Sequence, residues 1–464
     1  MLVPNAVDNL HVQQEDKSRQ RQLSRVLRFR DLFLLIIGTV IGSGIFLVPG
    51  AVLRPLGNSI ALGLCVWIAG GVLSLLGALT YGELSAMKPQ AGGLYVYIRD
   101  CFGPFLAFLF GWTLFFVISA GSVATLAVAF SNYLAEFIPL TPLLAKLVSV
   151  LMIAVICVVN VRGTRQSSDL QNVTTTLKVA AIVLMGAALL WMGKSFGAVI
   201  ATSQHLSPGA LASGFGLAMI SVLWAYEGWQ YATFTAGETL NPQRNFPLAF
   251  LAGSVALIGI YLFANVAYLA ALGADGVANS NRVAATAVSF VIGPRVAKLV
   301  ALTILISMFS AANSIMLTAP RVYYAMAKDG VFFQRLSEVH PRFGTPAFAV
   351  IAAAMWAATL AASGTFEQLL TYVVFIGWIF YALAAASVFV YRKRLPYANR
   401  PYRVPGYPVT PLVFIASAIG LVTNTIATQP KRAVVGLGIV LAGAPAYAIW
   451  RKLHAASTPV GSQA

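Results

Sequence analysis

Charged residues are scarce in this chain, since only 10% of its 464 residues are Asp, Glu, Lys or Arg and 59% are hydrophobic. An ordinary soluble domain carries about 25% charged residues, so this composition excludes a chain that is dissolved throughout in water. Histidine and cysteine are scarcer still, with 4 and 3 residues that lack the spacing of a metal site. We therefore expect no metal, no cofactor and no catalytic residues, because an enzyme would need converging His, Asp or Cys groups.

The three cysteines also exclude a framework of external disulfides. Cys65 and Cys157 fall in apolar segments, and Cys101 falls in a stretch that we expect to face the cytoplasm. We expect no cleavable signal peptide, because the first 31 residues are polar and charged, with no short apolar core. The first long apolar segment is then its own insertion signal.

Long runs of apolar residues make up most of the sequence, and the mean hydropathy is +0.80. A run of about 20 apolar residues is long enough to cross a bilayer as a helix. The sequence predicts twelve such spans: 32–54, 59–86, 104–134, 143–161, 171–193, 212–237, 247–272, 295–326, 347–363, 368–391, 410–428 and 432–450. The expected fold class is an all-α integral membrane protein with twelve transmembrane helices and two cytoplasmic tails, 1–30 and 453–464.

The formal net charge of +17 would by itself suit a nucleic-acid partner. The distribution of the basic residues excludes that partner. With the N-terminus inside, 22 of the 31 Lys and Arg fall in cytoplasmic segments, 8 fall in external ones and Lys178 falls inside a span. This is the positive-inside bias, so we expect a multi-pass protein of a bacterial inner membrane with both termini in the cytoplasm.

The segment Ile41-Gly42-Ser43-Gly44-Ile45-Phe46 interrupts the first predicted helix near its middle. Asp31 lies 11 residues before Gly42, so at about 1.5 Å per residue the glycines lie roughly 16 Å inside the membrane. Glycine weakens a helix, and the backbone groups that it frees cannot stay unpaired in hydrocarbon. The sequence therefore predicts a break that binds something polar at mid-membrane.

A second break is predicted in the sixth helix, where Glu227 and Gly228 interrupt an apolar segment 11 residues before Glu238. Its depth matches that of the first break, and the two helices are expected to run in opposite directions. Broken helices at corresponding places in two halves are typical of transporters built from inverted repeats, with the substrate at their interface. We expect 31–193 and 212–391 to be the two repeats and 410–452 to hold two further helices.

The two breaks together predict a site for a zwitterion. The N–H groups of residues 43–45 lie at the positive end of a half-helix and suit a carboxylate. Unpaired carbonyls just before each break, at 40–41 and at 223–225, suit an ammonium group. The alternative is that these small residues only let helices pack closely.

Two ionisable residues lie inside predicted helices, where a charge is costly and indicates a function or a partner. Glu227 either caps the inner half of the sixth helix, which we favour, or titrates during transport. Lys178 lies 9 residues from Asp169, hence about 14 Å deep. Three roles are open for it: an ammonium in the place of a coupling cation, a proton carrier, or a lysine paired with a neighbouring carbonyl.

Other residues are expected to complete the site. Trp224 either closes over the substrate or serves plain packing. The pocket is expected to be shaped by one residue of the sixth helix and three of the third: Gln230, Ser119, Ala120 and Ser122. Glu83, near the inner end of the second helix, is expected to form a cytoplasmic gate or salt bridge.

Four motifs give this sequence a likeness to a known family. They are Gly38-Thr-Val-Ile-Gly-Ser-Gly-Ile-Phe-Leu-Val-Pro49, Tyr81-Gly-Glu-Leu84 with Pro89-Gln-Ala-Gly-Gly-Leu-Tyr95, Trp224-Ala-Tyr-Glu-Gly-Trp229 with Gly237-Glu-Thr-Leu-Asn-Pro242, and Pro320-Arg-Val-Tyr-Tyr-Ala-Met-Ala-Lys-Asp-Gly330. Through them 31–391 resembles the amino acid-polyamine-organocation superfamily, and within it the prokaryotic relatives of the L-type amino acid transporters. The resemblance implies a LeuT-type fold of five plus five inverted helices, with helices 1 and 6 discontinuous, and two further helices. It also implies sodium-independent transport of amino acids.

The resemblance assigns site residues by position. The implied substrate-binding residues are Ile41, Gly42, Ser43, Gly44, Ile45, Trp224, Ala225, Glu227 and Gln230. Those at 42–45 are implied to meet the substrate carboxylate, the carbonyls of 41, 224 and 225 to meet the amine, and Trp224 to be the aromatic gate. Lys178 matches a lysine that replaces a sodium site in this family. Glu227 departs from the glycine of eukaryotic members but resembles the acidic residue of bacterial ones.

Eukaryotic light chains of this family attach to a glycoprotein through a cysteine between the third and fourth helices. The corresponding loop here, 135–142, contains no cysteine. We therefore expect no disulfide-linked heavy chain and a protein that acts alone as a monomer, with an amino acid as substrate and the lipid bilayer around it.

The expected function is exchange of small or medium neutral L-amino acids by alternating access. Two alternatives stay open: proton-coupled uptake with Lys178 or Glu227 as the carrier, and transport of cationic amino acids or polyamines. A channel would be distinguished by conductance well above the rate of a saturable exchanger.

Overall fold

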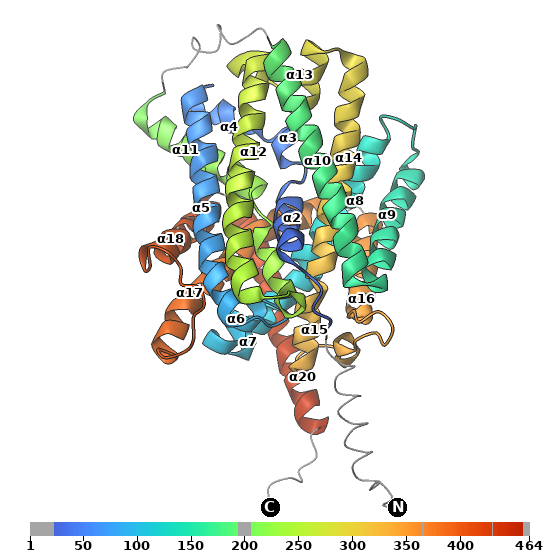
Figure 1. Ribbon diagram of the computed structural model, residues 1–464, viewed down its shortest axis with the longest axis vertical. Coiled ribbons are helices and arrows are strands. Elements are labelled where there is room, and N and C mark those ends of the chain that lie inside the picture. Colours follow the sequence, from blue (N-terminus) through green and yellow to red (C-terminus); the bar gives the residue numbers. More distant parts are fainter. Residues whose placement is uncertain (1–22, 194–205, 364–365, 429, 458–464) are drawn as a thin grey trace, which may run out of the picture.

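The computed structural model describes residues 23–193, 206–363, 366–428 and 430–457. Helices make up nearly all of its regular structure (Figure 1), and these residues form no β-strand, only an isolated parallel bridge between Leu27 and Thr239. The predicted all-α class is confirmed. Most of the two predicted tails, at 1–22 and 458–464, lies outside the described residues.

The first half of the chain begins with an interrupted helix. Its elements are α2 (Phe29–Val40), α3 (Gly44–Leu47), α4 (Pro49–Leu53), η1 (Arg54–Leu56), α5 (Ile60–Met87), α6 (Leu94–Phe102), α7 (Pro104–Thr113), α8 (Ser119–Leu134), α9 (Pro142–Arg162) and α10 (Thr164–Met192). A π-helical turn, Leu114–Ile118, joins α7 to α8. Local chemistry explains several starts, since the hydroxyls of Ser59 and Thr141 accept from N–H groups in the first turns of α5 and α9.

The second half repeats the interruption. Its elements are α11 (Pro208–Ala225), η3 (Trp229–Glu238), α12 (Pro242–Ala278), α13 (Val283–Val291), α14 (Pro294–Thr318), α15 (Pro320–Lys328), η4 (Gln334–Ser337), α16 (Ala347–Ser363), α17 (Phe366–Arg394), α18 (Val409–Thr428), α19 (Pro430–Leu441) and α20 (Gly443–Ser457). Several begin with proline, which loses nothing at a first turn whose N–H groups have no partner. The short helices α6 and α13 were not among the predicted elements.

Ten segments of the described chain are long and apolar enough to cross a membrane, as expected of an integral membrane protein. They coincide with ten of the predicted spans, and α19 and α20 together supply the last of these. The other two predicted spans correspond to α16, which is shorter at 17 residues, and to α17. The total of twelve transmembrane helices therefore stays a prediction.

The two breaks lie where glycine and Glu227 predict them. α2 ends at Val40 and α3 begins at Gly44, while α11 ends at Ala225 and the chain turns through Gly228 before η3. Gly228 has φ +124°, which a residue with a Cβ rarely adopts. After the second break the chain continues as a 3₁₀ helix rather than an α-helix.

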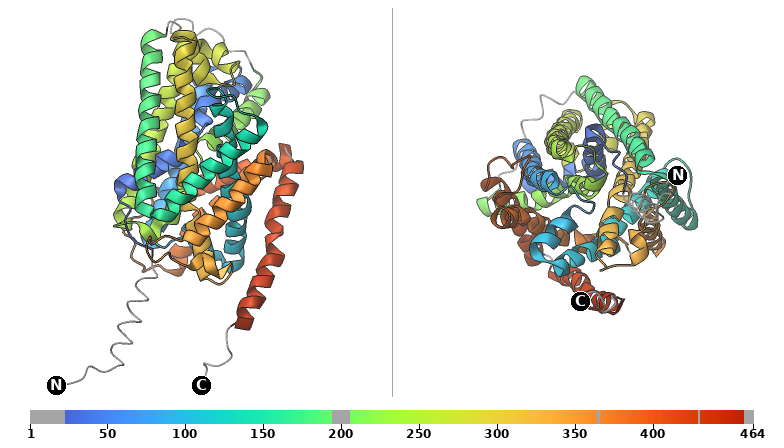
Figure 2. Two further views of the ribbon diagram at one scale, coloured as in Figure 1. Left: turned by 90° about the vertical axis from the view of Figure 1, so that its right-hand side faces the viewer. Right: turned by 60° about the horizontal axis from the view of Figure 1, so that its bottom comes forward.

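The two broken segments run in opposite directions. Leu27, before α2, is bridged to Thr239, after η3, whereas Gly44 beyond the first break lies against Ala225 before the second. α2 packs against α10, α12, α14 and η3, and the right-hand view of Figure 2 shows it inside the ring of other helices. Two interruptions that are far apart in sequence thus meet in the middle of the bundle.

Candidate functional site

The backbones of the two breaks approach each other closely. A Cβ added at Gly44 would lie 3.1 Å from Ala225 Cβ, and one added at Gly228 would lie 3.0 Å from the carbonyl oxygen of Thr39. Such contacts are tighter than most real Cβ contacts, so with any other residue a neighbour would have to move by a few tenths of an ångström. Two of the three glycines that mark the breaks therefore favour the close crossing.

Tyr261 of α12 joins the breaks from outside. Its hydroxyl lies 2.9 Å from the carbonyl oxygen of Ala225 and 3.2 Å from that of Val40. Both carbonyls come from the last turn of a helix, and that of Val40 also accepts the N–H of Gly42 at 2.9 Å. One buried phenol therefore stabilises both helix ends at once.

Lys178 donates to two further carbonyls just before the first break. Its Nζ donates to the carbonyl oxygens of Gly38 at 2.7 Å and Ile41 at 2.5 Å, and the side chain is fully buried. The Ser307 hydroxyl of α14 donates to the carbonyls of Ile41 and Gly42, each at 2.9 Å. Of the three open roles, the pairing with carbonyls is the contact that the structure contains.

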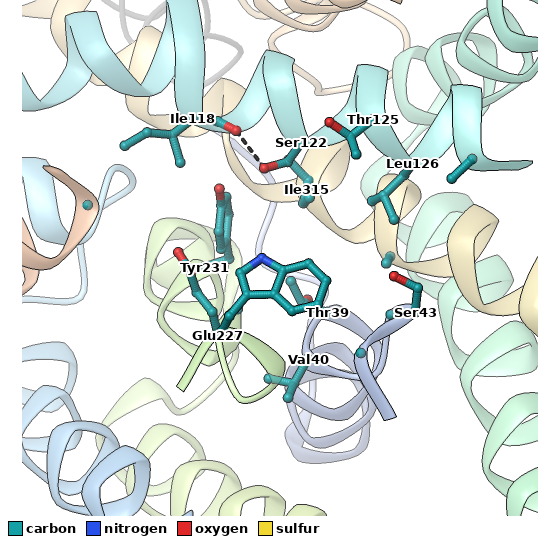
Figure 3. Close-up of a pocket in the computed structure, with 17 residues that line it drawn as sticks. Thr39, Val40, Ser43, Ile118, Ser122, Thr125, Leu126, Glu227, Tyr231 and Ile315 are labelled. Atoms are coloured by element: carbon teal, nitrogen blue, oxygen red, sulfur yellow. Dashed lines mark hydrogen bonds between the residues drawn. The ribbon is translucent and has the colours of Figure 1, made fainter. Parts of the chain in front are cut away.

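A cavity of about 140 Å³ lies beside both breaks (Figure 3). By the same measure one water needs about 10–15 Å³, so the cavity has room for a small organic molecule. Its walls come from α2 and α3, from the second break, and from α8, α14 and α17: Thr39, Val40, Gly42, Ser43, Gly44, Ile118, Ser122, Thr125, Leu126, Ala129, Trp224, Glu227, Gly228, Tyr231, Ala311, Ile315 and Gly377.

Both hydroxyls on the α8 wall already bond to backbone carbonyls one turn earlier. Ser122 donates to the carbonyl of Ile118 at 2.6 Å, and Thr125 donates to that of Gly121 at 2.8 Å. In contrast, no acceptor is recorded in the described residues for the N–H groups of residues 43–45. The first turn after the break therefore has spare donors, and those of Ser43 and Gly44 belong to residues that line the cavity.

Glu227 supplies the acidic group of the cavity. The hydroxyl of Tyr381 in α17 donates to Glu227 Oε1 at 2.9 Å, and the hydroxyl of Tyr81 donates to the Tyr381 carbonyl at 2.9 Å. The favoured expectation that Glu227 caps the inner half-helix is wrong, because η3 has no side-chain cap and the carboxyl turns to α17 instead. Gln230 Oε1 accepts the Gly228 N–H at 3.1 Å and so holds the turn.

Known proteins resemble this chain over almost its whole length. The family model described as amino acid permease matches residues 27–443. This chain belongs to that family. The serine/threonine exchanger SteT of Bacillus subtilis (strain 168) is 33% identical over 419 residues, which cover 89% of this chain and 94% of the relative.

Two human relatives are similar to this permease to the same degree. The cystine/glutamate transporter of Homo sapiens is 32% identical over 442 residues, covering 93% of this chain and 87% of that protein. The human b(0,+)-type amino acid transporter 1 is 33% identical over 428 residues, covering 90% and 86%. The resemblance drawn from the four motifs is confirmed, and the chain is a member of a family of amino acid transporters.

The cavity of this permease includes some of the predicted site residues and omits others. Gly42, Ser43, Gly44, Trp224 and Glu227 line it, whereas the other predicted residues are not among those that line it: Ile41, Ile45, Ala225, Gln230 and Lys178. The expectation of unpaired carbonyls is wrong for Ile41, Val40 and Ala225, because side chains of α10, α12 and α14 already donate to them. Trp224 lines the cavity and is 38% exposed, so its indole is only partly covered by other residues in this conformation.

Sequence reasoning missed most of the wall opposite the breaks. Of the three predicted third-helix residues only Ser122 lines the cavity, with Thr125, Leu126 and Ala129 of the same helix. Ser119 instead bonds to the Tyr323 hydroxyl. Tyr231 was also missed, although it lies four residues after Glu227, and Figure 3 shows both on the same side of the cavity.

Ion pairs close the end of the permease where α2 begins and α20 ends. Arg321 Nε and Glu238 Oε2 lie 2.5 Å apart with both side chains fully buried, and the Thr164 hydroxyl donates to Glu238 Oε1 at 2.6 Å. Glu83 pairs with Arg392 at 2.7 Å, which is the salt bridge foreseen for it. The cavity instead extends along α8 as far as Ala129, toward the opposite end.

Proposed function

We propose that this permease exchanges small or medium neutral L-amino acids across the membrane, without sodium, by alternating access. One observation carries the proposal: a cavity at the crossing of two broken helices presents spare N–H donors and a carboxyl group together. Figure 3 shows Ser43 and Glu227 on opposite sides of that cavity. An α-amino acid has the matching pair of charges.

The substrate carboxylate would bind at the N–H groups of Ser43 and Gly44, with the Ser43 hydroxyl beside them. A half-helix N-terminus favours an anion there. The substrate ammonium would bind the Glu227 carboxylate, because the neighbouring carbonyls already have donors. The substrate ammonium thus binds the side chain of Glu227, and not the backbone carbonyls that the sequence predicts.

The remaining wall sets the preference for the substrate side chain. Ile118, Leu126 and Ile315 are apolar, and Ala129 and Ala311 leave room beside them. A cavity of about 140 Å³ with this lining supports a short neutral side chain. The printed name of the Bacillus subtilis relative, a serine/threonine exchanger, agrees with such a substrate.

Lys178 supports independence from sodium. Its ammonium already donates to the carbonyls of Gly38 and Ile41, which are the oxygen ligands that a cation beside this break would use. A fixed positive charge there would repel a second cation.

Alternating access would move the two broken segments against α8, α9, α14 and α16. We place both termini in the cytoplasm of a bacterial cell, so the conformation seen here faces outward, with its ion pairs on the cytoplasmic side. The division into inverted repeats at 31–193 and 212–391, and action as a monomer without a heavy chain, belong to the same proposal.

Counterflow in proteoliposomes tests this function. Vesicles loaded with unlabelled serine should take up labelled serine faster than empty vesicles, and replacing external sodium by potassium should leave the rate unchanged. Equal uptake by loaded and empty vesicles would reject exchange, and loss of uptake in potassium would reject sodium independence.

A second candidate function is favoured by the charge of the site. None of the ion pairs recorded among the described residues includes Glu227, and Lys178 contacts only carbonyls. A carboxylate without a cationic partner would also accept a cationic side chain or carry a proton. Arginine that competes with serine more strongly than alanine does would favour a cationic substrate. Uptake into empty vesicles driven by a pH gradient would favour proton coupling.

A further inference from the structure

A basic hollow of about 460 Å³ lies at the start of α2, away from the substrate cavity. It is lined by Arg25, Val26, Arg28, Arg30, Asp31, Arg165 and Leu240. None of the ion pairs recorded in the described part of the chain includes Arg25, Arg28 or Arg30. The hollow is therefore lined by three arginines that have no recorded ion-pair partner among the described residues.

The one carboxylate in the hollow does not neutralise them. Asp31 Oδ1 accepts from Asn172 Nδ2 at 2.7 Å, and Oδ2 accepts from Arg165 Nη1 at 2.9 Å and from the backbone N–H of Arg28 at 2.8 Å. Because Asp31 is 3% exposed and fully engaged, an anion from outside would meet net positive charge.

An apolar groove of about 670 Å³ begins beside the hollow. Its lining is Phe29, Arg244, Asn245, Leu248, Leu251, Ala252 and Val255. Leu248, Leu251 and Val255 are 45%, 44% and 53% exposed on one face of α12. From Arg244 to Val255 the helix rises about 16 Å, which matches the roughly 15 Å of hydrocarbon in one leaflet.

The hollow and the groove are lined by residues that are near neighbours in the chain. Phe29 lines the groove while Arg28 and Arg30 line the hollow, and Leu240 of the hollow lies four residues before Arg244 of the groove. Figure 1 shows the dark-blue start of α2 beside the lower end of α12. A basic hollow thus lies beside an apolar groove whose length along α12 is about that of one leaflet.

We propose that this feature binds an anionic phospholipid, with the phosphate among Arg25, Arg28 and Arg30 and one acyl chain along α12. A guanidinium group can donate two parallel hydrogen bonds to the oxygens of one phosphate. An exposed face of leucine and valine side chains can pack against an acyl chain. A soluble phosphate would fill only the hollow. Only a lipid of this charge and shape uses both parts.

The position of the lipid gives it a role in the conformational cycle. The segment before α2 is tied to the end of the sixth segment by three backbone hydrogen bonds: Val26 and Leu27 N–H to the Glu238 carbonyl, and Leu240 N–H to the Leu27 carbonyl. The basic hollow contains Val26 and Leu240 from the two sides of this junction. A bound lipid therefore stabilises the closed state of this end of the protein.

Native mass spectrometry of the purified full chain tests the proposal, with phosphatidylglycerol and phosphatidylcholine offered in equal amounts. We expect retention of phosphatidylglycerol by the wild type. The triple variant Arg25→Gln, Arg28→Gln, Arg30→Gln should lose that preference by roughly 100-fold, at about fivefold per arginine near the surface. The matched control, Arg335→Gln with Arg342→Gln, removes two exposed arginines elsewhere and should retain it.

Two further arms separate the possible sources of binding. Ala252→Trp fills the groove without a change of charge and should also abolish retention of the lipid, while inorganic phosphate should not compete with it. Melting curves check that each variant is folded, and added phosphatidylglycerol should raise the melting temperature only of the wild type and the control. Equal retention by the triple variant and the control, or full competition by inorganic phosphate, would overturn the proposal.

Discussion

Lys178 and Ile41 are 137 residues apart in sequence, yet the Lys178 ammonium donates to the Ile41 carbonyl at 2.5 Å in the middle of the protein. The same nitrogen bonds to the Gly38 carbonyl at 2.7 Å. One side chain of α10 therefore replaces the donors that the broken helix lacks at this point.

Replacing Lys178 by Met should reduce serine uptake by tenfold or more. The substitution keeps the length of the stem but leaves the Gly38 carbonyl without this donor, at a cost of about 1–3 kcal/mol, whereas the Ile41 carbonyl keeps the Ser307 hydroxyl. Lys146→Met, at an exposed position of α9, is the control and should keep wild-type rates. Uptake unchanged in the Lys178 variant would show that the ammonium is dispensable.

Larger side chains at the first break should abolish transport. Gly44→Leu puts side-chain atoms where Ala225 Cβ lies 3.1 Å away, and Ser43→Trp fills the cavity. Both variants should still elute as a single folded species in size-exclusion chromatography. Gly259→Leu, at an exposed glycine of α12 with nothing within 4 Å, is the control. Undiminished uptake by both site variants would discard the proposed binding site.

Glu227→Gln should raise the KM for neutral amino acids by about 10- to 100-fold, because a hydrogen bond to a charged group contributes about 1.5–3 kcal/mol. Tyr381→Phe removes only the phenol that donates to Glu227 and should have a smaller effect. Kinetics of labelled serine uptake in proteoliposomes measure both. A wild-type KM in the Gln variant contradicts the assignment of the substrate ammonium to Glu227.

Tyr261→Phe should lower stability by about 1–3 kcal/mol, because the Ala225 carbonyl loses its hydroxyl donor, while the Val40 carbonyl keeps the Gly42 N–H. Thermal melts monitored by size-exclusion chromatography measure the change. Tyr268→Phe is a matched control on the same helix, because the buried Tyr268 hydroxyl has no recorded partner. Equal melting temperatures for the two variants would remove the link between the breaks.

The buried pair of Arg321 and Glu238 should behave cooperatively. Replacing either residue by Met leaves an unpaired buried charge, which costs about 3–5 kcal/mol, whereas the double replacement removes both charges and should recover much of the stability. A thermal-melt double-mutant cycle measures the coupling. Additive losses would show that the two side chains act independently.

Local sequence patterns were sufficient to place most of the long apolar helices, but not the short helices α6 and α13. Runs of apolar residues marked ten segments that the structure confirms as long and apolar enough to span, and glycine with Glu227 marked both interruptions. These features depend only on a residue and its near neighbours in sequence. Proline and glycine, for example, affect a helix over one or two turns. The inner half of the sixth segment was harder, because a 3₁₀ helix and an α-helix share the same apolar composition.

The sequence by itself thus determined the all-α membrane class, the family and the positions of the two breaks. Only the tertiary structure decided which side chains donate to the carbonyls at the breaks. Lys178, Tyr261 and Ser307 do so from three separate helices. It also decided that Glu227 faces Tyr381 and that residues of α8 form the opposite wall. The physical reason is that such contacts depend on how whole helices pack, and that information is distributed over many weak contacts along the chain.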